Sequence, residues 1–263
     1  MKRAILATLS IIAVCSLCLA GTVNAAKEGY SFIVYSESAP TVDGTVAADE
    51  WTDAYIDFFY SGWTMTTNLW AVKWAGAYPE IHEYWCMEIF TDTTNDAGDW
   101  FQISMDTLKD GGTAPQADDF LINYTGHTAA GLKAYKGTGT GWAEFTGYVI
   151  GTDLTIATSF AASPKGATPH WIIEIDFYKV AGTFALQIDN NARVAAYDAS
   201  NPSAGVISWP PVSSADVPND YGDGTSDISG GTIPEGLTIG VMVLLSSVAV
   251  IVSSRYFRKQ LRI

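Results

Sequence analysis

The sequence predicts an all-β protein: an antiparallel β-sandwich, jelly-roll or immunoglobulin-like, with an N-terminal signal peptide and one C-terminal transmembrane helix. Three observations support this fold class. Apolar residues recur at every second position in short runs, turn-forming residues separate the runs, and apolar segments lie at both ends of the chain. No stretch from residue 26 to 212 shows a sustained 3.6-residue period. Short alternating runs separated by turns are typical of antiparallel sandwiches.

The first 25 residues are typical of a secretory signal peptide. Lys2 and Arg3 precede an apolar run, and the small-residue sequence Val23-Asn24-Ala25 provides a cleavage site. We therefore expect the mature chain to begin near residue 26, on the outer side of the membrane.

The C-terminal part divides into three predicted segments. Residues 213–232 are rich in Ser, Asp and Gly and are expected to form an acidic, flexible stalk. Residues 233–254 are expected to form the transmembrane anchor, because Leu237 to Ser254 is free of charge. Residues 255–263 are basic, so this tail is expected to stay in the cytoplasm. These segments predict a single-pass cell-membrane protein with most of its chain extracellular.

Residues 26–212 are expected to form the β-sandwich domain that binds a ligand. Alternating runs predict strands over residues 69–74, 84–90 and 170–177. Gly-, Asn- and Pro-rich clusters predict turns at five places, at residues 95–98, 109–112, 136–141, 163–166 and 201–203.

Charge and cysteine content limit the partners and the sources of stability. The net charge is −14, so nucleic acid is not expected as a partner. Of the three cysteines, Cys15 and Cys18 leave with the signal peptide, so Cys86 cannot form an internal disulfide. The stability of the domain must then come from a packed core.

Three segments resemble one known family. The opening at residues 40–54, with Asp43-Gly44 and Glu50-Trp51, resembles family 9 carbohydrate-binding modules and DOMON-like sandwiches. Residues 170–176 are similar to a late strand with one glutamate, and residues 198–209 resemble the closing strand with its tryptophan. The resemblance implies a non-catalytic module that binds a polysaccharide or another glycan. Together with the anchor expected at residues 233–254, it predicts a membrane-anchored carbohydrate-binding module. The C-terminal segment resembles archaeal-type surface anchors, some of which a sortase-like enzyme removes.

Sugar binding needs flat aromatic faces surrounded by hydrogen-bonding groups. The chain has nine Trp, thirteen Tyr and eleven Phe. Trp63, Trp142 and Trp209 lie in Gly- or Pro-flanked segments where an indole is harder to bury, so we predict them as ligand contacts. The resemblance makes Trp209 the best of the three.

A run between two predicted strands is rich in oxygen-bearing side chains. Calcium takes six to eight oxygen ligands, and Asp92, Asn95, Asp96 and Asp99 could supply several. We therefore predict a structural Ca²⁺ site there, with an acidic hairpin held by Asx turns as the alternative. The three histidines show no paired spacing, so the sequence gives zinc little support.

Two other functions are weighed against sugar binding. A structural or adhesive cell-envelope protein, with self-association at the envelope, would use the same sandwich. A DOMON-type haem-binding domain is less favoured because no haem-attachment motif is present. No catalytic signature is present. Glu144 and Glu174 could form a carboxylate pair, but no local motif marks them among 28 acidic residues, so no enzymatic activity is expected.

Overall fold

The computed structural model describes residues 26–77, 80–179, 183–184, 187 and 189–227. The predicted signal peptide, transmembrane anchor and basic tail lie outside these residues. Within the described part, no helix has the length and apolar character needed to cross a membrane.

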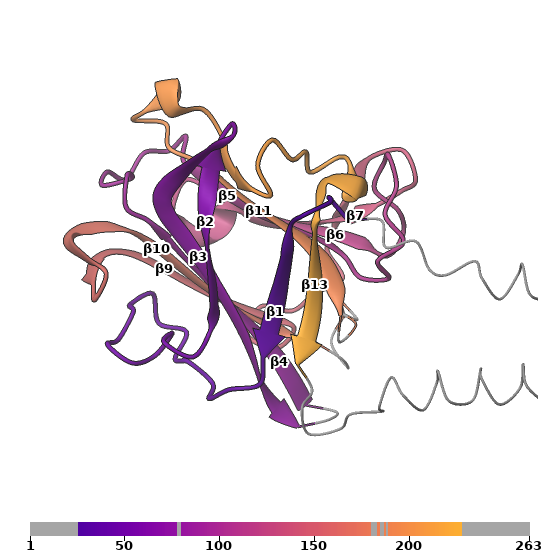
Figure 1. The fold of residues 1–263 in the computed structure, drawn as a ribbon, viewed down its shortest axis with the longest axis horizontal. Coiled ribbons are helices and arrows are strands. Elements are labelled where there is room, and N and C mark those ends of the chain that lie inside the picture. Colours follow the sequence, from indigo (N-terminus) through magenta and orange to yellow (C-terminus); the bar gives the residue numbers. More distant parts are fainter. Residues whose placement is uncertain (1–25, 78–79, 180–182, 185–186, 188, 228–263) are drawn as a thin grey trace, which may run out of the picture. The chain divides into compact units, whose positions relative to one another are not determined.

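Thirteen strands form one sheet, shown in Figure 1, and no α-helix occurs among the described residues. Every strand pair is antiparallel except β1 with β13. The all-β, antiparallel prediction is therefore confirmed. The strands are β1 (Ser31–Tyr35), β2 (Tyr55–Ser61), β3 (Thr64–Ala77), β4 (Glu80–Ile89), β5 (Trp100–Asp106), β6 (Asp119–Thr125), β7 (Leu132–Gly137), β8 (Trp142–Phe145), β9 (Leu154–Ser163), β10 (Gly166–Tyr178), β11 (Asn190–Tyr197), β12 (Ile207–Trp209) and β13 (Gly222–Asp227), with 3₁₀ turns η1 (Ala129–Gly131), η2 (Pro202–Ala204) and η3 (Pro218–Asp220).

The sheet curls so that its two halves face each other across one core. Its strand order is β8-β7-β6-β5-β11-β12-β2-β3-β4-β10-β9, so β10 and β5 are far apart along the sheet. Nevertheless, the ring of Trp171 on β10 lies 5.9 Å from that of Phe101 on β5 and 6.5 Å from that of Tyr124 on β6. The two facing layers of the predicted sandwich therefore belong to one continuous sheet.

The three predicted strands are confirmed and are neighbours in the sheet. They correspond to β3, β4 and β10, with Phe90 one residue past the end of β4, and β4 pairs with both others. Their alternating apolar residues lie in the core, where Trp70 stacks on Trp85 with ring centroids 5.4 Å apart. All five predicted turn clusters fall at connections between strands.

The outer face of β3 and β4 is buried as well. A second apolar cluster forms where Trp51 packs on Ala71, Ala75, Tyr84 and Cys86. Lys73 on this face is 0% exposed, and its buried ammonium is satisfied by donating to the Asp53 carboxylate and to the Glu50 carbonyl. The segment between β1 and β2 therefore covers part of this face.

The predicted flexible stalk is wrong for residues 213–227, while 228–232 lie outside the described residues. Tyr221 is fully buried, and β13 pairs with both β1 and β11. A Cβ atom on Gly222 or Gly224 would overlap the ring of Trp209 or Phe32 respectively. The small residues that resemble a linker are needed here because the backbone of β13 packs directly against aromatic rings of the core.

Candidate functional site

An open cleft lies on the outer face of the sheet, next to the part that residues 37–54 cover. Its volume is about 520 Å³, within the range usual for small-ligand sites. The β2 and β3 strands supply one wall, and the end of β4 with the β9–β10 hairpin supplies the other. The lining residues are Ile56, Phe58, Thr67, Leu69, Phe90, Lys165, Gly166, Ala167 and Thr168.

The lining combines aromatic surface with polar groups. Phe58 keeps 37% of its surface exposed, and Phe90 is half-buried. Thr67, Thr168 and Lys165 are exposed, so they can offer hydroxyl and ammonium groups to a ligand. Aromatic faces bordered by hydrogen-bonding side chains are suited to the apolar face and the hydroxyls of a pyranose ring.

Glu88 and His170, both buried, lie behind the hairpin side of the cleft, and the exposed Lys165 lies above them. The Lys165 ammonium lies 3.9 Å from the Glu88 carboxylate, and His170 Nε2 lies 3.3 Å from the other oxygen of that carboxylate. The His170 ring lies 4.4 Å from the ring of Phe90. A Cβ atom on Gly166 would come within 2.7 Å of the Phe90 ring, so glycine lets the hairpin approach that wall.

A carboxylate clamp fixes the segment beside the cleft. Glu174 on β10 accepts hydrogen bonds from the backbone N–H groups of Asp43 (3.1 Å) and Gly44 (2.9 Å) and from Trp51 Nε1 (3.0 Å). Burial raises the pKa of Glu174 to about 7, although the three donors act in the opposite direction. The glutamate and the opening segment singled out in the sequence therefore act together as a structural unit.

The three predicted ligand tryptophans are not brought together. Trp63 lies in the β2–β3 turn and is 69% exposed, with the Lys27 ammonium 5.5 Å from its ring centroid. Trp142 is half-buried at the start of β8, which is separated from β2 in the sheet by β7, β6, β5, β11 and β12. None of the three lines the cleft.

Trp209 is placed in the core, contrary to the prediction that it is hard to bury. It is 1% exposed, its ring lies 4.7 Å from that of Trp70, and its Nε1 donates to Asp57 Oδ2 at 2.7 Å. The aromatic ring of Phe32 on β1 also packs on it. Because its ring packs on Trp70 and Phe32 and its N–H is hydrogen-bonded, Trp209 is not accessible to a sugar.

Of the four residues predicted for calcium, two have buried carboxylates that face each other and two lie at the exposed side of the same connection. Asp92 and Asp99 are buried and approach each other, whereas Asn95 is exposed and Asp96 accepts a hydrogen bond from the Thr94 hydroxyl. Burial, followed by the charge of Asp99, raises the pKa of Asp92 to about 7.

Sequence reasoning missed His127 as a neighbour of these two aspartates. The register of β5 with β6 pairs Trp100 with Thr125, so Asp99 and His127 come together just beyond this end of the two strands. This pairing, had it been known, would have revealed the contact.

A second carboxylate group lies at the opposite end of the same two strands. Asp106, Asp110 and Asp118 approach within 4.8 Å of one another, and Asp119 pairs with Asp106 across the strands. Burial, followed by the charge of Asp106, raises the pKa of Asp119 to about 8. Asp118 and Asp119 therefore belong to a different group of acidic residues from Asp92 and Asp99.

The carboxylates considered as a catalytic pair have separate structural partners. Glu144 on β8 is exposed and forms an ion pair with Lys133, at 3.2 Å. Glu174 is buried in the clamp described above. Each is accounted for by its own contacts.

Comparison with known proteins identifies similar folds. No protein-family model and no curated protein sequence matches the chain. A family 9 carbohydrate-binding module from Caldicellulosiruptor kristjanssonii, solved with cellotriose, is 15% identical, with a TM-score of 0.50 over 78% of this chain and 98% of that one. The module solved with glucose is 14% identical, with a TM-score of 0.51 over 78% of this chain and 100% of that one.

A candidate carbohydrate-binding protein from Bacteroides uniformis has the same fold. It is 12% identical, with a TM-score of 0.50 over 76% of this chain and 100% of that one. These likenesses confirm, for the fold, the resemblance to family 9 modules seen in the sequence.

Proposed function

We propose that residues 26–227 form a non-catalytic carbohydrate-binding module and that the cleft between β2–β3 and the β9–β10 hairpin holds the saccharide. The observation that carries the proposal is the cleft itself, with the ring of Phe58 on one wall, that of Phe90 on the other and polar side chains at its rim. Similar folds that bind cellotriose and glucose support a glucose-containing ligand.

The physical argument concerns how a pyranose is recognised. The ring of Phe58 or Phe90 can cover an apolar sugar face, while Thr67, Thr168 and Lys165 can replace the water that hydrates the hydroxyls. A buried Glu88 carboxylate behind Lys165 orients the ammonium without filling the cleft. Binding in this way needs neither a nucleophile nor a general acid.

The cellular setting is part of the proposal and rests on the sequence. A signal peptide at 1–25 and an anchor at 233–254, with its basic tail, would display the module at the cell surface. There it would meet extracellular polysaccharide. A neutral polysaccharide suits a chain of net charge −14, because no like charge on the ligand repels it.

Isothermal titration of the full-length protein with cellotriose and glucose tests this proposal. We expect saturable binding that Phe58→Ala weakens roughly tenfold, since burying about 55 Å² of ring surface against a sugar face contributes about 1.4 kcal/mol. Met65→Ala, on the same hairpin, exposed and outside the cleft, is the matched control and should leave the affinity unchanged.

Trp63→Ala tests the site predicted from the sequence. If this variant abolishes binding while Phe58→Ala has no effect, the saccharide binds at the β2–β3 turn and the cleft assignment is wrong. Absence of binding to cellotriose, glucose and an array of other glycans would reject the function.

A further inference from the structure

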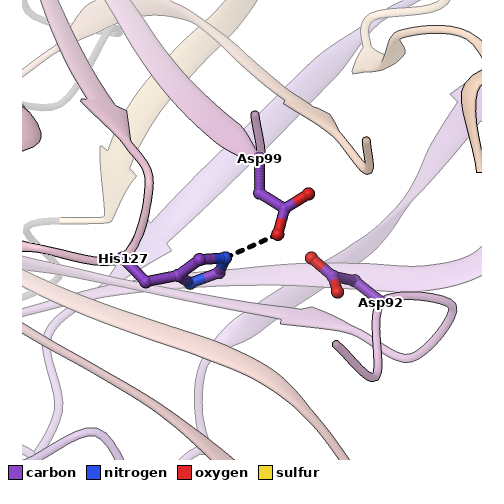
Figure 2. Close-up of side chains that lie close together, drawn as sticks. All are labelled: Asp92, Asp99 and His127. Carbon is purple, nitrogen blue, oxygen red and sulfur yellow. Dashed lines mark hydrogen bonds and ion pairs between the residues drawn. The ribbon is translucent and has the colours of Figure 1, made fainter. Parts of the chain in front are cut away.

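Three side chains from two separate connections meet beside the core. Asp92 follows β4, Asp99 precedes β5, and His127 lies in the connection between β6 and β7. One potential ligand atom from each lies within 4.8 Å of the other two. Figure 2 shows the Asp99 carboxylate hydrogen-bonded to the His127 ring, with the Asp92 carboxylate directed toward both.

Asp92 is left with an unsatisfied oxygen in this cluster. Its side chain is 0% exposed; Oδ1 accepts a hydrogen bond from the Thr94 N–H, and Oδ2 has no hydrogen-bond partner. An unpaired buried acceptor is unfavourable in a folded protein. Asp99, in contrast, accepts hydrogen bonds from His127 Nε2, from Asp96 N and from Ala199 N. A buried carboxylate that has an oxygen without a donor and faces two further ligand groups points to a bound cation.

The charge in the cluster also favours a cation. Within the described part of the chain, no Lys or Arg side chain is paired with Asp92, Asp99 or His127. When both carboxylates are ionised, they leave a net negative charge in a buried place even beside a protonated imidazole. Asp96 and Asp198 add further negative charge nearby.

The ligand types distinguish between metals. Calcium prefers six to eight oxygen ligands, whereas imidazole together with carboxylates suits Zn²⁺ at about 2.0–2.2 Å. The ring of His127 is held against Trp171, with centroids 4.3 Å apart, and against Phe160, with centroids 4.9 Å apart. These contacts fix the orientation of Nε2 toward the carboxylates.

We propose that Asp92, Asp99 and His127 form a structural site for one divalent transition-metal ion of the Zn²⁺ type. The ion replaces the hydrogen bond between Asp99 and His127 and binds Nε2 of the neutral imidazole. The proton displaced from Nε2 moves to Nδ1 when the ring starts neutral, and goes to solvent when the ring starts as an imidazolium. It ties the β4–β5 connection to the β6–β7 connection, and through Ala199 to the turn after β11. None of its three residues lines the proposed saccharide cleft.

The test measures Zn²⁺ binding to full-length protein stripped of metal with a chelator. We expect one Zn²⁺ per chain by titration calorimetry, and a rise in Tm of about 5–10 °C at a free Zn²⁺ concentration 100 times the Kd. Ca²⁺ at the same concentration should give no comparable shift. Co²⁺ in place of Zn²⁺ should give visible absorption bands that report nitrogen ligation.

Two variants and one matched control make the test specific. Asp92→Asn and His127→Gln should each lower the Zn²⁺ affinity by at least about 100-fold, because loss of a direct ligand exceeds the usual effect of an outer-shell change. Asp96→Asn removes an equal charge from the same connection without removing a ligand, and should bind Zn²⁺ nearly as well as the parent. If Asp92→Asn does not fold, the loss of the Co²⁺ bands in His127→Gln carries the test.

Three results would overturn the proposal. The first is absence of stoichiometric Zn²⁺ binding, which would mean that a proton shared by Asp92 and Asp99 balances the charge. The second is unchanged Zn²⁺ affinity in both variants. The third is a rise in Tm with Ca²⁺ that is as large as the rise with Zn²⁺ and is lost in Asp92→Asn. That result would mean that the site binds calcium.

Discussion

Replacing Glu174 by glutamine is expected to loosen the clamp that holds residues 43–51 on the sheet. The carboxylate accepts from three N–H donors, two on Oε2 and one on Oε1. Glutamine has the same shape but only one acceptor oxygen. If that oxygen serves the two backbone donors, its NH₂ group faces the indole N–H of Trp51, and two donors then oppose each other.

The magnitude follows from that count of donors. One hydrogen bond to a charged acceptor, worth about 1.5–3 kcal/mol, is lost, and a buried donor is left unpaired at about 1–3 kcal/mol. The raised pKa of Glu174 shows that burying its charge is itself unfavourable, which offsets part of this loss. We therefore expect Glu174→Gln to lower the free energy of unfolding by about 3 kcal/mol, and Tm by roughly 6–12 °C.

Urea unfolding at pH 8, where the carboxylate is ionised, measures this loss, and a double-mutant cycle with Trp51→Phe isolates the indole contact. Trp51→Phe removes the N–H, so Glu174→Gln should cost less in that background, with a coupling of about 1–2 kcal/mol. A loss below about 1 kcal/mol, or strictly additive variants, would refute the clamp.

Three further predictions concern the core, the C-terminal boundary and pH. Trp209→Ala should destabilise the fold by about 3–5 kcal/mol, because it removes a buried indole from the core; a variant that instead keeps the parent Tm in thermal unfolding would contradict the burial of this residue. A chain ending at Val212 should fail to give a cooperative thermal transition, whereas one ending at Asp227 should unfold cooperatively, since β13 pairs with β1 and β11. Equal transitions in the two chains would mean that residues 213–227 are a stalk outside the folded domain. The raised pKa of Asp119, about 8, means that the folded state holds this proton more tightly than the unfolded state, so stability from this group falls as pH rises from about 4 to 8. Asp119→Asn should flatten the pH dependence of urea unfolding between pH 5 and 8, and an unchanged slope would show that Asp119 does not cause it.

Local pattern was sufficient for three neighbouring strands near the β9 edge of the sheet. In β3, β4 and β10, inward tryptophans and isoleucines alternate with other residues, so period and residue type agree. The alternation did not distinguish buried from exposed faces, because the 37–54 segment buries Ala71, Lys73 and Cys86 on the outer side as well. Coverage of that face depends on a segment far away in sequence.

Composition was misleading where backbone packs against aromatic rings. Residues 222–227 have the Gly, Ser and Asp content of a linker. Positions 222 and 224 nevertheless require glycine, because Trp209 and Phe32 leave no room for a Cβ atom. The same contact explains Trp209. Flanking prolines indicated a loop, while the partners that bury its ring lie on β1 and β3.

Both candidate sites assemble residues that are distant in sequence. The cleft joins β2 and β3 to a hairpin about one hundred residues later in the chain. Leu69 and Phe90 fall in predicted strands and Lys165 in a predicted turn, but no lining residue was predicted as a ligand contact. Asp92 and Asp99 were predicted as metal ligands, whereas His127 required the β5–β6 register. Sequence therefore provided individual residues, and strand pairing determined which of them meet.

A crystal structure of the protein soaked with cellotriose tests the central claim most directly. We predict a glucosyl ring in the cleft, against Phe58 or Phe90, with a hydroxyl within hydrogen-bond distance of Lys165 or Thr168. A sugar bound instead at Trp63, with an empty cleft at saturating ligand, would contradict this account.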